Sequence, residues 1–201
     1  MIRVLVAEDQ AMVRGALVSL LTLESDIAVV AEAGDGREAV ELAVATAPDV
    51  ALVDIEMPVL DGLEAAAAMA RQAVGVRVVI LTTFGRPGFL RRALQAGVRG
   101  FLLKDAPAAA LAQAVRDVVA GKVVVQPELA VTALSEGDSP LTPREQEVLR
   151  LCRSGRPVAA IAEELHLTEG TVRNYLSEAI GKLGAQTRVE AALIAERKGW
   201  L

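Results

Sequence analysis

Short apolar runs alternate with longer stretches of helical period through the first 120 residues, and this alternation constrains the fold more than any other feature. The runs of strand length cover residues 2–7, 27–31, 50–53, 77–81 and 100–103. Helical spacing of apolar residues covers residues 11–23, 37–46, 63–72, 87–96 and 107–120. Such serial βα units predict an α/β fold: a doubly wound parallel sheet of five strands, in the order 2-1-3-4-5, with helices on both faces.

The character of the chain changes after this first domain, which we place at residues 1–121. Residues 122–140 lose the helical period and collect Pro, Gly and Ser toward their end, which indicates a linker. Residues 141–201 return to helical spacing and predict an all-α domain of four short helices. The breaks between these helices fall at residues 154–157, 166–168 and 184. Thr142 and Glu145 have the spacing of an N-cap and its capping-box partner.

The charge of the chain is unevenly distributed. The formal net charge is −5, and residues 1–137 carry 12 basic against 17 acidic side chains, whereas residues 138–201 carry 9 of each. A nucleic-acid-binding chain usually has a basic footprint. Any DNA-binding function therefore has to work with an acidic first domain and a neutral second domain.

The sequence offers no signal for membrane insertion or secretion. No apolar run approaches the ~18 residues of a membrane span, and the N-terminal sequence MIRVLVAED lacks the layout of a secretory signal. The single cysteine, Cys152, cannot form an internal disulfide, which fits a reducing compartment. We therefore expect a cytoplasmic protein without membrane insertion.

Polar side chains follow the expected strands where each strand ends. They are Glu8 and Asp9 after the first strand, Asp54 after the third, Thr82 after the fourth and Lys104 after the fifth. The carboxyl ends of neighbouring parallel strands meet at one edge of the sheet, so we expect these side chains to converge. Carboxylates ~4 Å apart repel by roughly 4 kcal/mol per pair at an effective dielectric of 20. A hard divalent cation such as Mg²⁺ would neutralise them.

This group of residues suits phosphoryl transfer to a carboxylate. Asp54 is the best-placed nucleophile, Glu8 and Asp9 suit a metal ion, Lys104 would hold phosphoryl oxygens and the Thr82 hydroxyl would donate to one of them. Taken singly, Asp9 could cap the following helix, Thr82 could be a turn residue and Lys104 a solvated charge. Their common position at strand ends favours the joint interpretation.

Residues 1 to about 121 resemble the receiver domain of two-component response regulators, which has a flavodoxin-like fold. The matching features are the pair Glu8-Asp9, the stretch VALVDIEMPVLDG, Thr82, Phe101 and Lys104. The resemblance implies that Asp54 accepts phosphate from a phosphohistidine of a sensor kinase. It also implies that Mg²⁺ is held by Asp9, Asp54 and the backbone carbonyl of Glu56, and that Thr82 and Phe101 reorient on phosphorylation.

The second domain contains the pattern of a helix-turn-helix, with helix VAAIAEEL, turn HLTE and helix GTVRNYLSEAIGKL. A fragment of a helical repeat or a dimerisation bundle are the alternatives, but the sequence shows no repeat period. Arg173 could reach guanine or phosphate, Asn174 adenine and Lys182 the DNA backbone. Thr168 and Thr171 could donate to phosphate at the helix start. An ordinary solvated helix face would also explain these residues.

Residues from PLTPREQEVL to RVEAALIA resemble the effector domain of LuxR/FixJ-type (NarL-type) regulators along nearly their whole length. The resemblance implies binding to double-stranded promoter DNA. The candidate DNA contacts are Thr168, Thr171, Val172, Arg173, Asn174, Ser177 and Lys182.

We therefore predict a transcription regulator rather than an enzyme, controlled by a sensor histidine kinase. A neutral effector domain gains phosphate contacts when two copies bind, so phosphorylation should promote a homodimer that binds half-sites about 34–36 Å apart. An aspartyl-phosphate phosphatase or phosphotransferase, or a phosphorelay adaptor that does not bind DNA, are the alternatives. The motifs LTTFGRPGF, LLKD and KGWL resemble DesR-like regulators of lipid desaturation, which implies target genes of membrane lipid or transport function.

Overall fold

The computed structural model describes residues 1–83, 87–127, 129–130, 139–153 and 155–201. The chain divides into two compact units, one formed by most of residues 1–131 and the other by residues 132–201. Three parts of the sequence pattern lie outside the described residues, namely residues 128 and 131–138 of the expected linker, residues 84–86 of the motif LTTFGRPGF, and Ser154 of the first helical break. No helix of the described chain is long and apolar enough to cross a membrane.

The first unit is built around a parallel sheet, and its strands begin where the apolar runs begin. The strands are β1 (Ile2–Ala7), β2 (Ile27–Ala33), β3 (Val50–Asp54), β4 (Arg77–Thr82), β5 (Gly100–Leu103) and β6 (Val124–Val125). Their order is β2-β1-β3-β4-β5-β6, and every neighbouring pair is parallel. The predicted α/β fold and the order of its first five strands are therefore confirmed.

The sixth strand is the one departure from the expected sheet. Val124–Val125 lies in the stretch expected to be a linker and pairs with Gly100 and Phe101 of β5. A strand of two residues is too short to show a period of apolar residues, so the sequence pattern does not identify it. The side chain of Gln126 strengthens the junction by accepting a hydrogen bond from the backbone N–H of Leu103 at 2.7 Å. The free edge of β5 is thereby covered, as the edges of native sheets usually are.

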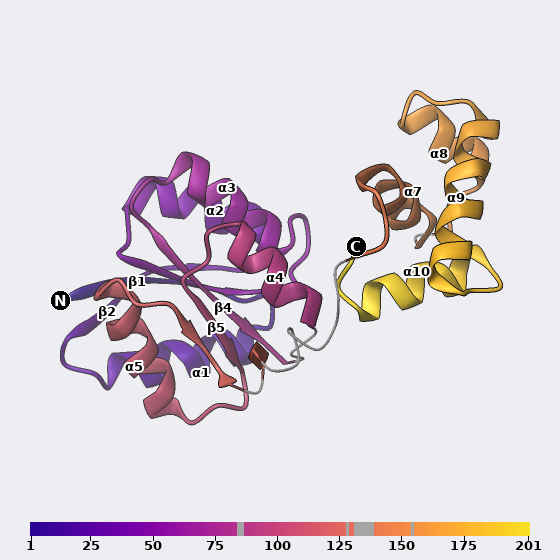
Figure 1. The fold of residues 1–201 in the computed structure, drawn as a ribbon. Coiled ribbons are helices and arrows are strands. Elements are labelled where there is room, and N and C mark those ends of the chain that lie inside the picture. Colours follow the sequence, from indigo (N-terminus) through magenta and orange to yellow (C-terminus); the bar gives the residue numbers. More distant parts are fainter. Residues whose placement is uncertain (84–86, 128, 131–138, 154) are drawn as a thin grey trace. The chain divides into compact units, whose positions relative to one another are not determined.

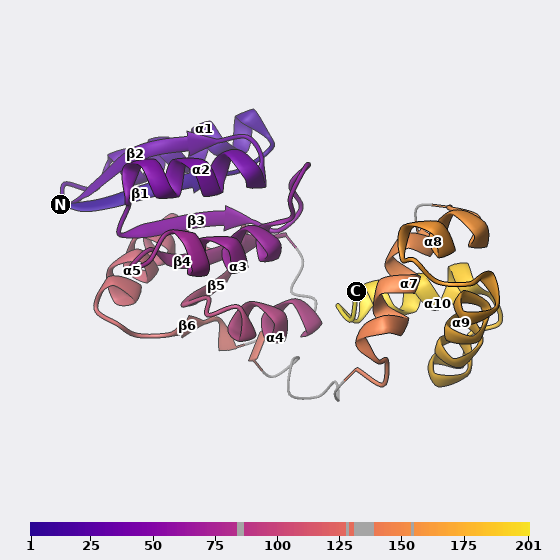
Figure 2. The ribbon, with the colours of Figure 1, turned by 90° about the horizontal axis from the view of Figure 1, so that it is seen from above.

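Helices cover both faces of the sheet, as the order of the strands requires (Figure 1). They are α1 (Ala11–Thr22), α2 (Gly36–Thr46), α3 (Gly62–Gln72), α4 (Pro87–Gln95) and α5 (Ala108–Val119). Figure 1 shows α2, α3 and α4 on one face and α1 and α5 on the other, and Figure 2 shows the sheet order from above. The core under α1 and α5 contains Val4, Leu52 and Leu81 of the strands and Leu21 and Val115 of the helices.

The loop that follows β3 packs tightly because two helices begin with glycine. A Cβ atom on Gly62 would lie 1.9 Å from the carbonyl oxygen of Asp54, and one on Gly36 would lie 2.0 Å from that of Leu60. Asp61 caps α3 and forms a capping box with Glu64. The end of β3, where the candidate nucleophile lies, is therefore fixed against the first turn of α3.

The described residues of the second unit form four helices, α7 (Pro143–Arg153), α8 (Val158–Glu164), α9 (Glu169–Leu183) and α10 (Arg188–Arg197). They surround one apolar cluster that includes Leu149, Ile161, Leu176 and Ala195. The predicted capping box at the start of α7 is confirmed. The backbone N–H of Glu145 donates to Thr142 Oγ1 at 3.3 Å, and the backbone N–H of Thr142 donates to Glu145 Oε2 at 2.7 Å.

Candidate functional site

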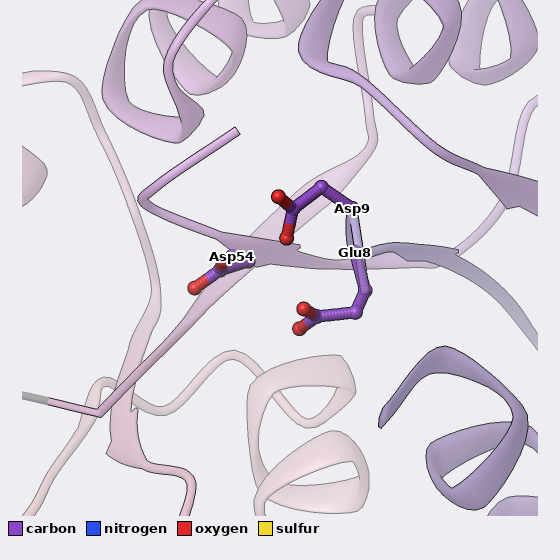
Figure 3. A group of neighbouring side chains, drawn as sticks. All are labelled: Glu8, Asp9 and Asp54. Carbon is purple, nitrogen blue, oxygen red and sulfur yellow. The ribbon is translucent and has the colours of Figure 1, made fainter. Parts of the chain in front are cut away.

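The ends of β1 and β3 bring three carboxylates together. Glu8 and Asp9 follow β1 directly, and Asp54 is the last residue of the buried strand β3. One oxygen of each carboxylate lies within 4.8 Å of the others. The three carboxylates surround a common space (Figure 3). Glu8 and Asp54 are buried and Asp9 is exposed, so the group is open to solvent on the side of Asp9.

A single ammonium group bridges the two buried carboxylates. Nζ of Lys104 lies 2.6 Å from Oε2 of Glu8 and 3.0 Å from Oδ1 of Asp54. Lys104 follows β5, and its backbone N–H donates to the carbonyl oxygen of Thr82 at 2.8 Å. This bond continues the ladder between β4 and β5 and holds the lysine at the carboxyl edge of the sheet.

Burial and the neighbouring opposite charges shift the pKa values of Glu8 and Lys104 in opposite directions. Burial raises the pKa of the Glu8 carboxyl, and although Lys104 lowers it, the pKa stays above its ordinary value. Burial would lower the pKa of the Lys104 ammonium, but its contacts with Glu8 and Asp54 outweigh burial and the pKa is raised. Lys104 therefore stays charged at neutral pH.

The arrangement fits a hard divalent cation by the chemistry of its donors. Three carboxylates and one ammonium carry a formal charge of −2, and all the available ligand atoms are oxygens, as Mg²⁺ prefers. Arg14 of α1 supports the site from outside this group, because its Nη1 donates to the carbonyl oxygen of Glu8. This role of Arg14 could not be predicted from the sequence, since it depends on where α1 packs.

The remaining candidate residues of the first unit lie around this group. Thr82 is buried at the end of β4, and Phe101 is buried within β5. The side chain of Glu56 is exposed in the bend that follows β3. Thr82 therefore ends the strand next to Asp54, while Phe101 lies on the strand that leads to Lys104.

The second unit presents a helix-turn-helix, formed by α8 and α9. His166 joins the two helices in the left-handed conformation, with φ of 53°, and the backbone N–H of Leu167 donates to the carbonyl oxygen of Ala162 at 2.8 Å. Thr168 caps α9 by accepting a hydrogen bond from the backbone N–H of Thr171 at 3.1 Å. The hydroxyl groups of Thr168 and Thr171 are 2.9 Å apart, so both lie at the start of α9.

The other candidate DNA contacts fall into three groups. Arg173, Asn174 and Ser177 are exposed on one helix, as expected of residues that face DNA. Val172 is fully buried in the helical core, so the structure does not place it on the outward face. Nζ of Lys182 lies 2.7 and 2.8 Å from the two carboxylate oxygens of Glu145, which is itself fully buried.

Two family models cover most of the chain. The response regulator receiver domain matches residues 4–116, and the LuxR family of bacterial regulatory proteins matches residues 139–195. These matches fall on the two units that hold the acidic group and the helix-turn-helix, respectively.

Several relatives match the chain over nearly its whole length. An uncharacterised transcriptional regulatory protein, YvfU of Bacillus subtilis, is 50% identical over 201 residues and 100% of both chains. The transcriptional regulatory protein DesR of the same organism is 48% identical over 200 residues, covering 100% of this chain and 99% of the relative. A structure of the response regulator RcsB in complex with DNA is 25% identical with a TM-score of 0.66, covering 98% of each chain.

Proposed function

The chain belongs to the two-component response regulators that carry a LuxR-family DNA-binding domain, and we propose that phosphorylation of its Asp54 controls the binding of promoter DNA. As a member of this family it is a transcription regulator that works with a sensor histidine kinase and promoter DNA. It is not an enzyme, and the alternatives of a phosphatase and of an adaptor without DNA binding are therefore wrong. The residue roles that follow are proposals.

The observation that carries the proposal is the bridge of Lys104 between Glu8 and Asp54 at the edge of the sheet. In the proposed reaction, an oxygen of Asp54 forms a bond to the phosphorus of a phosphohistidine while the bond from phosphorus to the histidine nitrogen breaks. Lys104 would then exchange its contact with Glu8 or Asp54 for a phosphoryl oxygen. The hydroxyl group of Thr82 would donate to another phosphoryl oxygen.

Mg²⁺ is the proposed cofactor. Asp9 and Asp54 would hold the ion with their carboxylates, the backbone carbonyl of Glu56 would add a third oxygen, and Glu8 would contribute negative charge nearby. The ion would supply positive charge for the phosphoryl oxygens during transfer. The exposed position of Asp9 supports this role, because an ion can approach from that side without disturbing the core.

The proposed response to phosphorylation involves residues of β4 and β5. Lys104 is tied to Thr82 through its backbone, and Phe101 lies three residues earlier on β5. A phosphoryl group that draws Lys104 and Thr82 toward Asp54 would disturb the buried packing of Phe101. We propose that Thr82 and Phe101 change position together and favour a homodimer.

DNA binding is assigned to the exposed side chains of α9. Arg173, Asn174 and Ser177 would face base edges, and Thr168 and Thr171 would donate to phosphate at the start of the helix. The similarity to a regulator solved in complex with DNA supports this assignment. A homodimer would place two such helices on half-sites about 34–36 Å apart.

The target genes remain a separate proposal. The relative DesR is a transcriptional regulator, and the sequence motifs that resemble DesR-like regulators point to genes of membrane lipid or transport function. We also propose, from the sequence, that the receiver domain ends at residue 121 and that the DNA-binding domain begins after residue 140.

The test of the proposed function compares the wild type with Asp54→Asn. Both are incubated with a small phosphoryl donor, such as acetyl phosphate, and Mg²⁺, and the bound phosphate is measured by mass spectrometry. Binding is then measured on duplexes selected from a random pool by the phosphorylated wild type. We expect phosphate on the wild type alone and weaker DNA binding by the variant. Equal DNA affinity of phosphorylated and unphosphorylated wild type would overturn the proposal.

A further inference from the structure

Glu145 is the one fully buried charged side chain among the described residues of the helical unit, and two donors converge on its carboxylate. It is fully buried in the first turn of α7. The backbone N–H of Thr142 donates to it at 2.7 Å, and Nζ of Lys182 contacts both of its oxygens, at 2.7 and 2.8 Å. Because a buried carboxylate needs partners, these contacts are required for the stability of the unit rather than optional.

The contact joins two elements that lie far apart in the sequence. Glu145 belongs to the first turn of α7, and Lys182 belongs to the last turn of α9, 37 residues later. The proposed DNA-facing residue Arg173 lies nine residues before Lys182 on the same helix, or about 13 Å along its axis. The ion pair therefore fixes the far end of the helix whose near half carries the proposed DNA contacts.

Glu145 also lies next to the segment that enters the helical unit. Thr142, which donates to the carboxylate, directly follows Leu141, and the N–H of Leu141 donates to Ser139 Oγ at 3.2 Å. The side chain of Gln146 reaches Ser139 Oγ at 3.2 Å as well. One carboxylate thus connects the entry of the chain, the start of α7 and the end of α9.

We propose that Lys182 is a positioning residue for α9 rather than a direct contact to DNA. If Lys182 turned to a phosphate, it would leave Glu145 buried without its cation, and that loss outweighs the gain from one solvent-exposed phosphate contact. Lys182 therefore keeps its contact with Glu145 when DNA binds, and it acts by holding α9 at a fixed angle to α7. The inference rests on the proposed function of α9 as the DNA-binding helix.

The test measures DNA affinity against salt concentration for full-length protein on a duplex selected from random DNA by the phosphorylated wild type. A direct phosphate contact contributes about 1 to the slope of log affinity against log salt. We expect Lys182→Met to weaken binding about tenfold or more with an unchanged slope. Lys182→Arg keeps the charge and the donors, so we expect it to restore binding. Arg150→Met is the control for a lost charge, because Arg150 is exposed and has no ion pair among the described residues.

A paired variant separates positioning from direct contact. Glu145→Met combined with Lys182→Met replaces the ion pair with two apolar side chains of similar length, which proteins often tolerate. We expect this double variant to bind DNA more tightly than either single variant. Trp200, the single tryptophan, is partly buried and packs against the helical core, so its fluorescence shows whether each variant is folded at the temperature of the measurement.

Two results would overturn the inference. One is a slope that falls by about 1 in Lys182→Met and is not regained in the double variant, because that identifies a phosphate contact. The other is unchanged affinity in Lys182→Met, because then the ion pair does not position α9. Failure of the wild type to bind any selected duplex would instead count against the proposed function.

Discussion

The ammonium of Lys104 lies 3.0 Å from Oδ1 of Asp54, although Asp54 ends β3 and Lys104 follows β5, on either side of β4. The same ammonium lies 2.6 Å from Glu8, whose side chain is fully buried. One cation therefore compensates two carboxylates that would otherwise repel across the edge of the sheet. Under the proposed function, phosphorylation of Asp54 would depend on the same contact that compensates these buried charges.

Lys104→Met should destabilise the receiver domain in the absence of metal by about 3–5 kcal/mol, because it leaves Glu8 and Asp54 without their cation. Added Mg²⁺ should recover more stability in the variant than in the wild type, since no ammonium competes for the site. Hydrogen exchange of the strand peptides, followed by mass spectrometry, measures both effects. Lys122→Met, which removes an exposed pair with Asp117, is the control and should cost at most about 1 kcal/mol. Equal effects of the two substitutions would contradict the prediction.

Gly62→Ala should strongly destabilise the receiver domain, by more than about 3 kcal/mol, because the new Cβ would lie 1.9 Å from the carbonyl oxygen of Asp54. Gly15→Ala is the matched control. Gly15 lies within α1 with nothing within 4 Å of its ideal Cβ, so this substitution should stabilise by about 0.5–1 kcal/mol. Urea unfolding, monitored by circular dichroism, gives the free energy of unfolding of each variant. A small loss of stability in Gly62→Ala would show that the loop can shift.

Val59→Asn should stabilise the receiver domain by about 1 kcal/mol. Val59 has φ of 69°, a left-handed conformation that is costly for a β-branched residue and that asparagine tolerates better. The residue is 68% exposed, so the substitution loses little packing. Thermal unfolding of the wild type and the variant gives the difference in stability. A lower melting temperature of the variant would mean that the valine makes contacts that offset the strain.

Glu169→Gln should tighten DNA binding several-fold at low salt. Arg173 forms an ion pair with Glu169 one turn earlier on α9, and both side chains are exposed. The acid must give up this partner when Arg173 contacts DNA, and it also repels phosphate. Arg173→Ala should weaken binding by about 1–3 kcal/mol. Fluorescence anisotropy at several salt concentrations measures both, and unchanged affinity of Glu169→Gln would exclude competition between the acid and DNA.

The helical unit should lose stability as the pH falls below the ordinary pKa of glutamate. Burial would raise the pKa of Glu145, but hydrogen bonds from Lys182 and from the backbone of Thr142, together with the contact with Glu178, outweigh it and the pKa is lowered from 4.5. A lowered pKa stabilises the folded state fully above pH 4.5, and this contribution disappears as the pH falls through the folded value.

Urea unfolding monitored by Trp200 fluorescence at a series of pH values measures this loss in the full chain, because the single tryptophan reports the helical unit alone. Glu145→Gln has no carboxyl to titrate and should show a weaker dependence on pH over this range. The same dependence in both proteins would assign the effect to other acids.

Much of the fold and of the candidate site could be predicted from local sequence. Apolar period identified the first five strands within two residues at each end, because burial on both faces leaves a continuous apolar run. The position of Asp54 and Lys104 at strand ends predicted that they would meet, since parallel strands share one carboxyl edge. The capping box of Thr142 and Glu145 was predictable because both partners lie within one turn.

Contacts between distant segments could not be predicted in the same way. The sequence suggested that Lys182 faces DNA, yet in the structure its Nζ contacts the buried Glu145. Arg116 of α5 likewise pairs with Glu24 and Asp26, about 90 residues earlier. No periodicity connects residues so far apart in the chain.

The sequence by itself determined the two-part organisation, the strands and helices, and the chemical types of the residues at the carboxyl edge of the sheet. These features depend on interactions within a few residues and on the alternation of apolar and polar positions. Only the tertiary structure decided that Lys104 bridges two carboxylates and that Glu145 holds Lys182. Those outcomes depend on how helices and strands cross in space, because the crossing sets the distance between atoms that the sequence keeps far apart.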